Sequence, residues 1–123
     1  MREKFSEAHK NDLGWNSFVT ELLTNQLTIS EMKDLRDNFK SWMKSKSIKT
    51  PVTLGFASSE IVPEPLGVAL VLSAWNYPVY TALPQVAAAI CAGNCVILKP
   101  SEVSSFTSNC LKELFDKYLD PST

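Results

Sequence analysis

Polar residues follow each of two short apolar segments in the second half of the chain. Residues 75–77 (WNY) come soon after apolar residues 66–72, and residues 99–102 (KPSE) come directly after apolar residues 95–98. In an open parallel sheet, ligands bind beyond the carboxyl ends of the strands, where helix amino-termini also point their N–H groups. The sequence therefore predicts one ligand site to which one cluster brings an amide and the other brings an ammonium and a carboxylate.

The elements that must position these clusters alternate between strand and helix patterns. Residues 66–72 and 95–98 are almost wholly apolar, which is typical of parallel strands covered on both faces. Residues 103–118 have apolar side chains at helical spacing. The order strand, helix, strand, helix predicts an α/β fold, with a right-handed βαβ unit as part of a Rossmann-like parallel sheet.

The helix between the two strands is bounded by proline and glycine. Pro78 is suited to the first turn of a helix that runs to about Cys91, because a missing N–H does little harm there. We expect Pro84 to kink or delay this helix. Gly93 and Asn94 then end it with a left-handed cap.

The first half of the chain predicts a long helix and a hairpin. Apolar residues recur every three or four positions over residues 15–43, which indicates one amphipathic helix with a buried side. A polar connector ends at a proline, and residues 52–65 are typical of a short hairpin with an edge open to pairing. We expect a helical segment at 1–50, a connector of the oligomerisation type at 51–65 and a partial dinucleotide-binding domain at 66–123.

The cysteines and the histidine do not form a reactive or metal-binding set. Cys91, Cys95 and Cys110 lie in apolar or helical patterns without a neighbouring cation to lower a thiol pKa, so we interpret them as small hydrophobic residues without a disulfide. His9 is the single histidine and lies far along the chain from every cysteine. We therefore expect no metal site.

Composition excludes several classes of partner. The chain of 123 residues has a formal net charge of -1 and no block of one charge, which argues against nucleic acid. No apolar run approaches the length of about 20 residues that spans a bilayer, and the first residues alternate in charge where a signal peptide would be apolar. We expect a cytoplasmic location, or the cytosolic face of a membrane with any anchor outside this chain.

Three segments resemble consecutive motifs of the aldehyde dehydrogenase superfamily, and of its class 3 or fatty aldehyde type in particular. They are residues 64–68 (EPLGV), 74–78 (AWNYP) and 92–102 (AGNCVILKPSE). Looser similarity extends back to His9 and forward to Asp120, so the resemblance covers nearly the whole chain. It implies an NAD(P)-dependent enzyme that oxidises an aldehyde to a carboxylate.

For Asn76 the resemblance implies the role of hydrogen-bond donor to an oxyanion. This oxyanion forms when a cysteine thiolate attacks the aldehyde carbonyl, and removing one such donor typically costs about 2.7 to 4 kcal/mol in the transition state. The residue type alone allows another interpretation, in which Asn76 caps the helix that follows.

The resemblance also implies cofactor contacts for Lys99, Ser101 and Glu102. Lys99 and Glu102 would bond the hydroxyls of the adenosine ribose, and the carboxylate would favour NAD over NADP without excluding NADP, because it repels a 2′-phosphate. In the alternative interpretation, Glu102 caps its helix and Lys99 is merely solvated.

Four aromatic residues are expected either to pack inside the fold or to lie near the cofactor. The resemblance places Trp75 near the cofactor, whereas residue type alone makes Trp75 and Tyr77 packing residues, and both interpretations stay open. Trp15 and Trp42 are expected to be core residues of the long helix.

Parts of the family's machinery are expected outside these residues. The resemblance places the glycine-rich phosphate turn, the general-base glutamate and the nucleophilic cysteine after Thr123, and a first helix before Met1. We therefore expect a fragment that is inactive alone. One alternative is an interaction protein whose hairpin forms a homodimer or pairs with a full-length subunit; another is a non-functional partial gene product.

Overall fold

The computed structural model describes residues 1–120, in which helices alternate with two short two-stranded sheets. The elements are α1 (Arg2–Leu13), α2 (Ser17–Thr20), the π-helix η1 (Glu21–Gln26), α3 (Leu27–Trp42), β1 (Lys46–Ile48), the 3-10 helix η2 (Val52–Leu54), β2 (Ser59–Ile61), β3 (Val68–Leu72), α4 (Leu83–Cys91), β4 (Cys95–Lys99), the 3-10 helix η3 (Glu102–Ser104) and α5 (Ser105–Tyr118). The predicted α/β class, with a parallel strand pair, a long helix and a hairpin, is confirmed.

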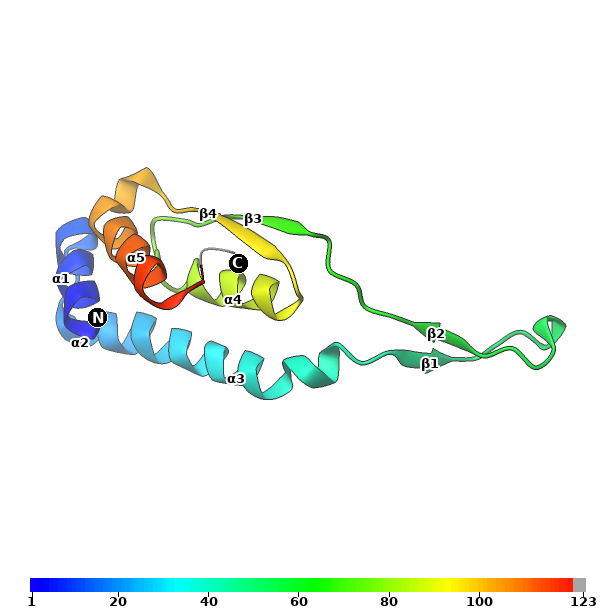
Figure 1. Ribbon diagram of the computed structural model, residues 1–123. Coiled ribbons are helices and arrows are strands. Elements are labelled where there is room, and N and C mark those ends of the chain that lie inside the picture. The colour runs from blue at the N-terminus through cyan, green and yellow to red at the C-terminus, as the bar shows by residue number, and fades with distance from the viewer. Residues whose placement is uncertain (121–123) are drawn as a thin grey trace.

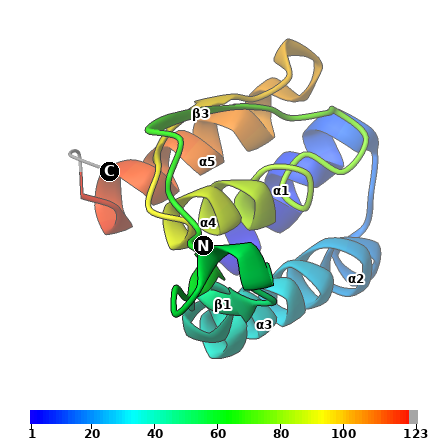
Figure 2. The same cartoon turned by 90° about the vertical axis from the view of Figure 1, so that its right-hand side faces the viewer.

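The elements form layers, with the β1–β2 hairpin projecting away from them. In Figure 1 the sheet of β3 and β4 lies above α4, α4 lies above α3, and α5 lies against α1. The view in Figure 2, with the hairpin toward the reader, shows the same order of sheet, α4 and α3. α4 therefore separates the parallel sheet from the long helix.

β3 and β4 pair in parallel over five residues each. The register runs from Val68 opposite Cys95 to Leu72 opposite Lys99. At the start of the pair, the side chain of Asn94 accepts a hydrogen bond from the Gly67 amide at 3.0 Å. The predicted βαβ order is thus realised, because α4 connects two parallel neighbours.

Only one face of this sheet is covered within residues 1–120. Exposure alternates along both strands, and Val68, Leu70, Leu72 and Ile97 are each more than half exposed. α4 packs on the opposite face, where the intervening side chains are half-buried. The prediction that both faces are buried is wrong for the described part of the chain, because the apolar residues on the second face have nothing packed against them there.

The helix between the strands begins later than its sequence pattern predicts. α4 starts at Leu83, and Pro78 is buried in the turn that precedes it. Pro84 lies in the first turn of α4, where a proline without an N–H is tolerated, so of the two predicted effects the delay is confirmed and the kink is not. Gly93, with a φ of 86°, follows the helix as the predicted left-handed residue.

The amphipathic helix predicted over residues 15–43 forms as three successive pieces, α2, η1 and α3. The Asn16 side chain caps its start by accepting a hydrogen bond from the Val19 amide at 2.9 Å. Trp42 is half exposed at the far end, so its assignment to the core is wrong. Trp15 lies before the helix and is half-buried against other rings.

A separate helix, α1, precedes this region and was not distinguished by the sequence pattern. It ends at Gly14, whose φ of 69° is left-handed. The Asp12 carboxylate near its end accepts hydrogen bonds from the amides of Phe106 and Thr107 at 3.1 and 2.7 Å. These amides belong to the first turn of α5, so α1 caps the last helix of the chain.

The hairpin is present, but its first strand lies earlier than predicted. β1 occupies residues 46–48 of the expected connector and pairs antiparallel with β2. The segment between them carries the fully exposed side chains of Val52 and Phe56. Across the described part of the chain, no helix combines the length and apolarity needed to cross a membrane.

Leu111 and Leu70 differ in burial and should differ in their contribution to stability. Leu111 is 1% exposed and belongs to the core with Phe5, Val79 and Ala82, whereas Leu70 is 62% exposed. We expect Leu111→Ala to lower the free energy of unfolding by about 2 to 5 kcal/mol. Leu70→Ala should change it by about 0.5 kcal/mol or less. Urea denaturation measures both, and equal losses would contradict the one-sided burial of the sheet.

Candidate functional site

The two polar clusters leave the sheet at the same edge. Because β3 and β4 are parallel, both carboxyl ends lie on one side, and the Ser73 amide donates a hydrogen bond to the Lys99 carbonyl at 3.1 Å. This bond joins the first residue after β3 to the last residue of β4. The segments that carry Asn76 and Glu102 therefore diverge from a single point.

The turn that carries Asn76 is held by hydroxyl groups. The Thr81 hydroxyl donates to the carbonyls of Ala74 and Tyr77 at 3.2 and 3.0 Å, and it lies 2.9 Å from the Ser73 hydroxyl. The Thr81 amide also donates to the Tyr77 carbonyl at 2.8 Å. These bonds close the turn between β3 and α4 on itself. No motif in the sequence marked Ser73 or Thr81 for this role.

Asn76 itself is exposed at this turn, and its side-chain amide has no hydrogen-bond partner among residues 1–120. The residue that precedes α4 is Ala82, and no side chain caps this helix. The alternative interpretation of Asn76 as the cap of the following helix is therefore wrong. Its amide is left to face solvent or a ligand.

The two aromatic residues beside Asn76 have different surroundings. Tyr77 is half-buried, and its ring meets Trp15 edge-on with 5.3 Å between ring centroids. Trp75 is half exposed. Packing thus describes Tyr77, whereas a large part of the Trp75 ring is open to solvent. Nothing in the sequence pattern connected Trp15 to this turn.

Lys99 and Glu102 form an ion pair at the same edge. The Lys99 Nζ lies 2.7 Å from the Glu102 Oε2, and both side chains are largely exposed. The hydrogen bond from Lys99 is the main cause that lowers the pKa of the Glu102 carboxyl, so this carboxyl stays ionised at neutral pH. Lys99 therefore has an ionised partner in addition to its solvation.

Ser101 caps the short helix that follows this strand. Its hydroxyl oxygen accepts a hydrogen bond from the Val103 amide at 3.3 Å. Its carbonyl accepts from the hydroxyls of Ser104 and Ser108 at 3.3 and 3.1 Å. The cap of η3 is thus Ser101, whereas the Glu102 carboxylate interacts with Lys99 and with its own backbone amide.

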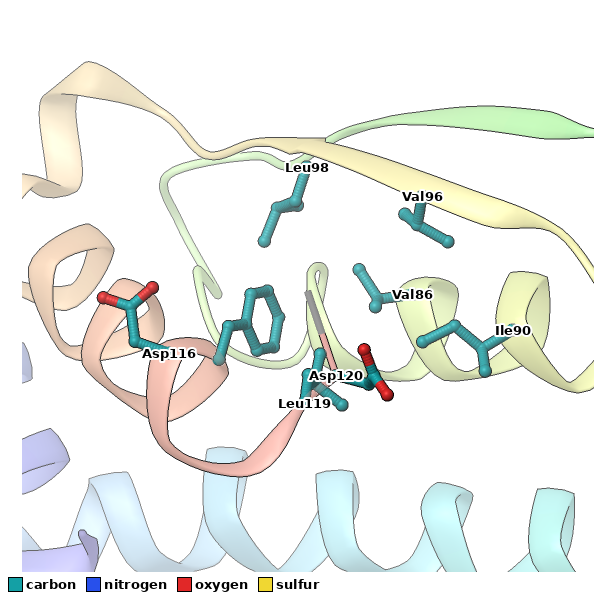
Figure 3. A pocket seen from close by; sticks show the side chains of 8 residues that line it. Val86, Ile90, Val96, Leu98, Asp116, Leu119 and Asp120 are labelled. Atoms are coloured by element: carbon teal, nitrogen blue, oxygen red, sulfur yellow. The ribbon is translucent and has the colours of Figure 1, made fainter. Parts of the chain in front are cut away.

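A pocket of about 280 Å³ lies elsewhere, between β4, α4 and the end of α5 (Figure 3). It is lined by Val86, Ile90, Val96, Leu98, Phe115, Asp116, Leu119 and Asp120. Val96 and Leu98 point into it from the covered face of the sheet, whereas Lys99, the next residue, lies on the other face. None of the predicted site residues lines this pocket.

The three cysteines are remote from the Asn76 turn or poorly reactive. Cys95 begins β4, about 13 Å of strand from Lys99, and Cys91 ends α4 near the same far edge. Cys95 is exposed, so the prediction that it is buried is wrong. Burial is the main cause that raises the pKa of the half-buried Cys110 thiol in α5. Among the described residues, Cys91 and Cys95 thus lie at the far edge of the sheet from Asn76.

Comparison with known proteins decides the family. The model of the aldehyde dehydrogenase family matches residues 20–122, which is most of the chain. The chain belongs to the aldehyde dehydrogenase family. The resemblance carried by residues 64–68, 74–78 and 92–102 is thereby confirmed.

Relatives of this aldehyde dehydrogenase chain extend the match to its amino-terminal helix. It is 44% identical to aldehyde dehydrogenase family 3 member H1 of Arabidopsis thaliana over 94% of the chain, and 36% identical to family 3 member B2 of Mus musculus over 98%. These relatives confirm the class 3 resemblance. The chain spans only 24% and 25% of their lengths.

A solved structure of similar fold also supports the assignment to the aldehyde dehydrogenase family. Staphylococcus aureus AldH in its substrate-bound state matches 97% of this chain with a TM-score of 0.87 and 31% sequence identity. The match covers 28% of that protein. The arrangement of α1, the projecting hairpin and the parallel sheet is therefore one that an aldehyde dehydrogenase adopts.

The ion pair at the site can be tested through the ionisation of Glu102. Replacing Lys99 in Lys99→Ala removes the hydrogen bond that lowers the pKa of Glu102, so this pKa should rise toward its ordinary value. Carboxyl carbon NMR during a pH titration measures it. Lys112→Ala, which removes a lysine paired with Asp116 instead, should leave Glu102 unchanged. An unchanged pKa in Lys99→Ala would contradict the pairing.

Proposed function

We propose that this segment contributes an oxyanion donor and half of a dinucleotide site to an NAD(P)-dependent aldehyde dehydrogenase. The donor is the amide of Asn76, and the ribose-binding groups are Lys99 and Glu102. The observation that carries the proposal is the hydrogen bond from Ser73 to Lys99, because it brings both clusters to one edge of the sheet. Family membership supplies the reaction class.

The chemistry requires a donor that strengthens its bond as negative charge develops. A cysteine thiolate adds to the aldehyde carbon, and the carbonyl π electrons move to oxygen. The amide of Asn76 donates to this oxygen. A bound nicotinamide cofactor would accept the hydride from the same carbon, and hydrolysis of the resulting thioester by water would release the carboxylate and the thiol. Asn76 suits the first step because its amide is exposed and unused within residues 1–120.

The cofactor end of the site is proposed at the start of η3. Lys99 would donate to a ribose hydroxyl, and the ionised Glu102 would accept from one. The carboxylate repels a 2′-phosphate, so the proposal favours NAD over NADP. Ser101 and Trp75 lie at the same edge, where the exposed part of the Trp75 ring can pack against the cofactor.

Binding of the cofactor tests this half of the proposal. Titration with NAD, followed by amide NMR, should shift the resonances of Lys99, Ser101 and Glu102. Glu102→Gln should weaken NAD binding about tenfold or more, since a hydrogen bond to a charged group contributes roughly 1.5 to 3 kcal/mol, and it should reduce the preference over NADP. Glu60→Gln, an exposed glutamate in the hairpin, is the control. NAD shifts that avoid residues 99–102 would overturn the assignment.

Turnover tests the catalytic half. A polypeptide of these 123 residues should produce no NADH from NAD and a medium-chain aldehyde, because Cys91 and Cys95 lie at the far edge of the sheet from Asn76 and burial raises the pKa of Cys110. Absorbance at the NADH band is the readout, with a purified full-length family member as positive control. Aldehyde-dependent NADH formation by the chain, lost in Cys95→Ser or Cys91→Ser, would contradict this expectation.

A second candidate function is pairing through the hairpin. Phe56 and Val52 are fully exposed on an arm that projects from the layers, and the strands β1 and β2 leave edges open (Figure 1). We expect Phe56→Ser to weaken association with a full-length family member, or with a second copy, in sedimentation velocity experiments. Phe18→Ser, an exposed phenylalanine on α2, is the matched control. A chain that remains monomeric with and without the full-length protein would exclude this function.

A further inference from the structure

The turn that carries Asn76 contacts a series of aromatic rings that begins in the amino-terminal helix. The rings of His9 and Trp15 lie with centroids 5.7 Å apart and planes at 33°, and Trp15 then meets Tyr77 at 5.3 Å and 69°. We infer that Trp15, supported by His9, is a positioning residue for the Asn76 turn. The inference rests on the proposed role of Asn76 as oxyanion donor.

His9, the first ring of this series, is held in one orientation. Its ring is fully buried, and its Nδ1 lies 2.8 Å from the Phe5 carbonyl oxygen, so Nδ1 carries the proton and donates it. The Nε2 is buried without a hydrogen-bond partner among residues 1–120. Burial is the largest cause that lowers the His9 pKa, which keeps the ring neutral. One tautomer and one orientation are therefore maintained.

Trp15 is constrained on both sides along the chain. Gly14 ends α1 in a left-handed conformation, and the Trp15 amide turns back to the His9 carbonyl at 3.4 Å. Asn16 directly follows and caps α2. Trp15 thus lies in a short junction between two capped helices, which limits the positions its indole ring can take.

The contact with Trp15 adds an external support to the bonds that close the Asn76 turn. The Thr81 hydroxyl bonds the carbonyls of Ala74 and Tyr77, which lie on the two sides of Asn76, and Val79 lies in the core, so both ends of the turn are anchored. Asn76 lies between these anchors, is exposed, and makes none of these bonds. The next residue, Tyr77, contacts Trp15 in the junction between α1 and α2. Because a displacement of about 1 Å can cost on the order of 100-fold in rate, this contact matters for an oxyanion donor.

Hydrogen exchange tests the inference in the chain itself. The reporter is the Thr81 amide, which bonds the Tyr77 carbonyl, and the reference is the Cys95 amide, which bonds Gly67 at the other edge of the sheet. Trp15→Ala should raise exchange at Thr81 about tenfold or more relative to Cys95. Trp15→Phe keeps a ring and should restore most of the protection. Trp42→Ala removes a half-exposed tryptophan at the end of α3 and should leave both amides unchanged.

Two outcomes would overturn the inference. Equal acceleration at Thr81 and Cys95 in Trp15→Ala would show that Trp15 supports the fold as a whole, and unchanged exchange at Thr81 would show that it does not hold the turn. A spectroscopic readout accompanies the exchange data: the side-chain amide resonances of Asn76 should shift in Trp15→Ala and not in Trp42→Ala, because movement of the Tyr77 ring changes the field at its neighbour.

The test separates this inference from the proposed function. Asn76→Ala should leave exchange at Thr81 unchanged, since the Asn76 side chain makes none of the bonds that close the turn. Should Asn76 not be the oxyanion donor, the exchange result with Trp15 would still stand. Should Trp15 not position the turn, NAD binding at residues 99–102 would still be observed.

Discussion

The hydrogen bond from the Ser73 amide to the Lys99 carbonyl is the last interaction that holds the two site-bearing segments together before they separate. It continues the parallel ladder of β3 and β4 past the last residue of β3. Beyond it, one segment turns through Asn76 toward α4, and the other passes through Glu102 into α5. An amide and an ion pair that lie far apart in the sequence share one edge because this ladder is parallel and in register.

The opposite edge of the sheet fixes that register. The Asn94 side chain bonds the Gly67 amide and also donates to the Ala89 carbonyl at 3.2 Å, so it ties the end of α4 to the start of both strands. Gly93 is required beside it, since its φ of 86° is left-handed and an added Cβ would lie 3.3 Å from Pro65. A slip of one residue would exchange the covered and exposed faces of a strand, and Asn94 opposes that slip.

Local sequence patterns predicted most of the strands and helices, whereas they carry no information on long-range contacts. The apolar runs at 66–72 and 95–98 predicted two parallel strands, and helical spacing predicted α5. The same runs predicted burial on both faces of the sheet, and one face is exposed in the described residues. Apolar composition alone does not show whether a helix or strand packs on a given face. The start of α4 was misplaced because Pro78 and Pro84 both satisfy the rule for a first turn.

In the candidate site, too, local patterns predicted some residues and missed those that depend on long-range contacts. Asn76 and Lys99 stood out because they follow strand patterns, and the parallel pairing brings their segments to one edge. The residues that hold these segments in place could not be predicted. Thr81 is one of many threonines, and Trp15 and Tyr77 are separated in sequence by more than half of the described chain. A long-range ring contact leaves no periodic signal in a single sequence, so the residues that hold a turn are harder to predict than those it presents.

The shared edge can be observed through the bond that defines it. In a uniformly labelled sample, a scalar coupling across the hydrogen bond between the Ser73 amide nitrogen and the Lys99 carbonyl carbon should be resolved, as should the one between Cys95 and Gly67 at the start of the ladder. Both couplings together would establish the parallel register from end to end. A resolved coupling for Cys95 and Gly67 with none for Ser73 and Lys99 would contradict the account, because the segments that carry Asn76 and Glu102 would then not leave the sheet from one point.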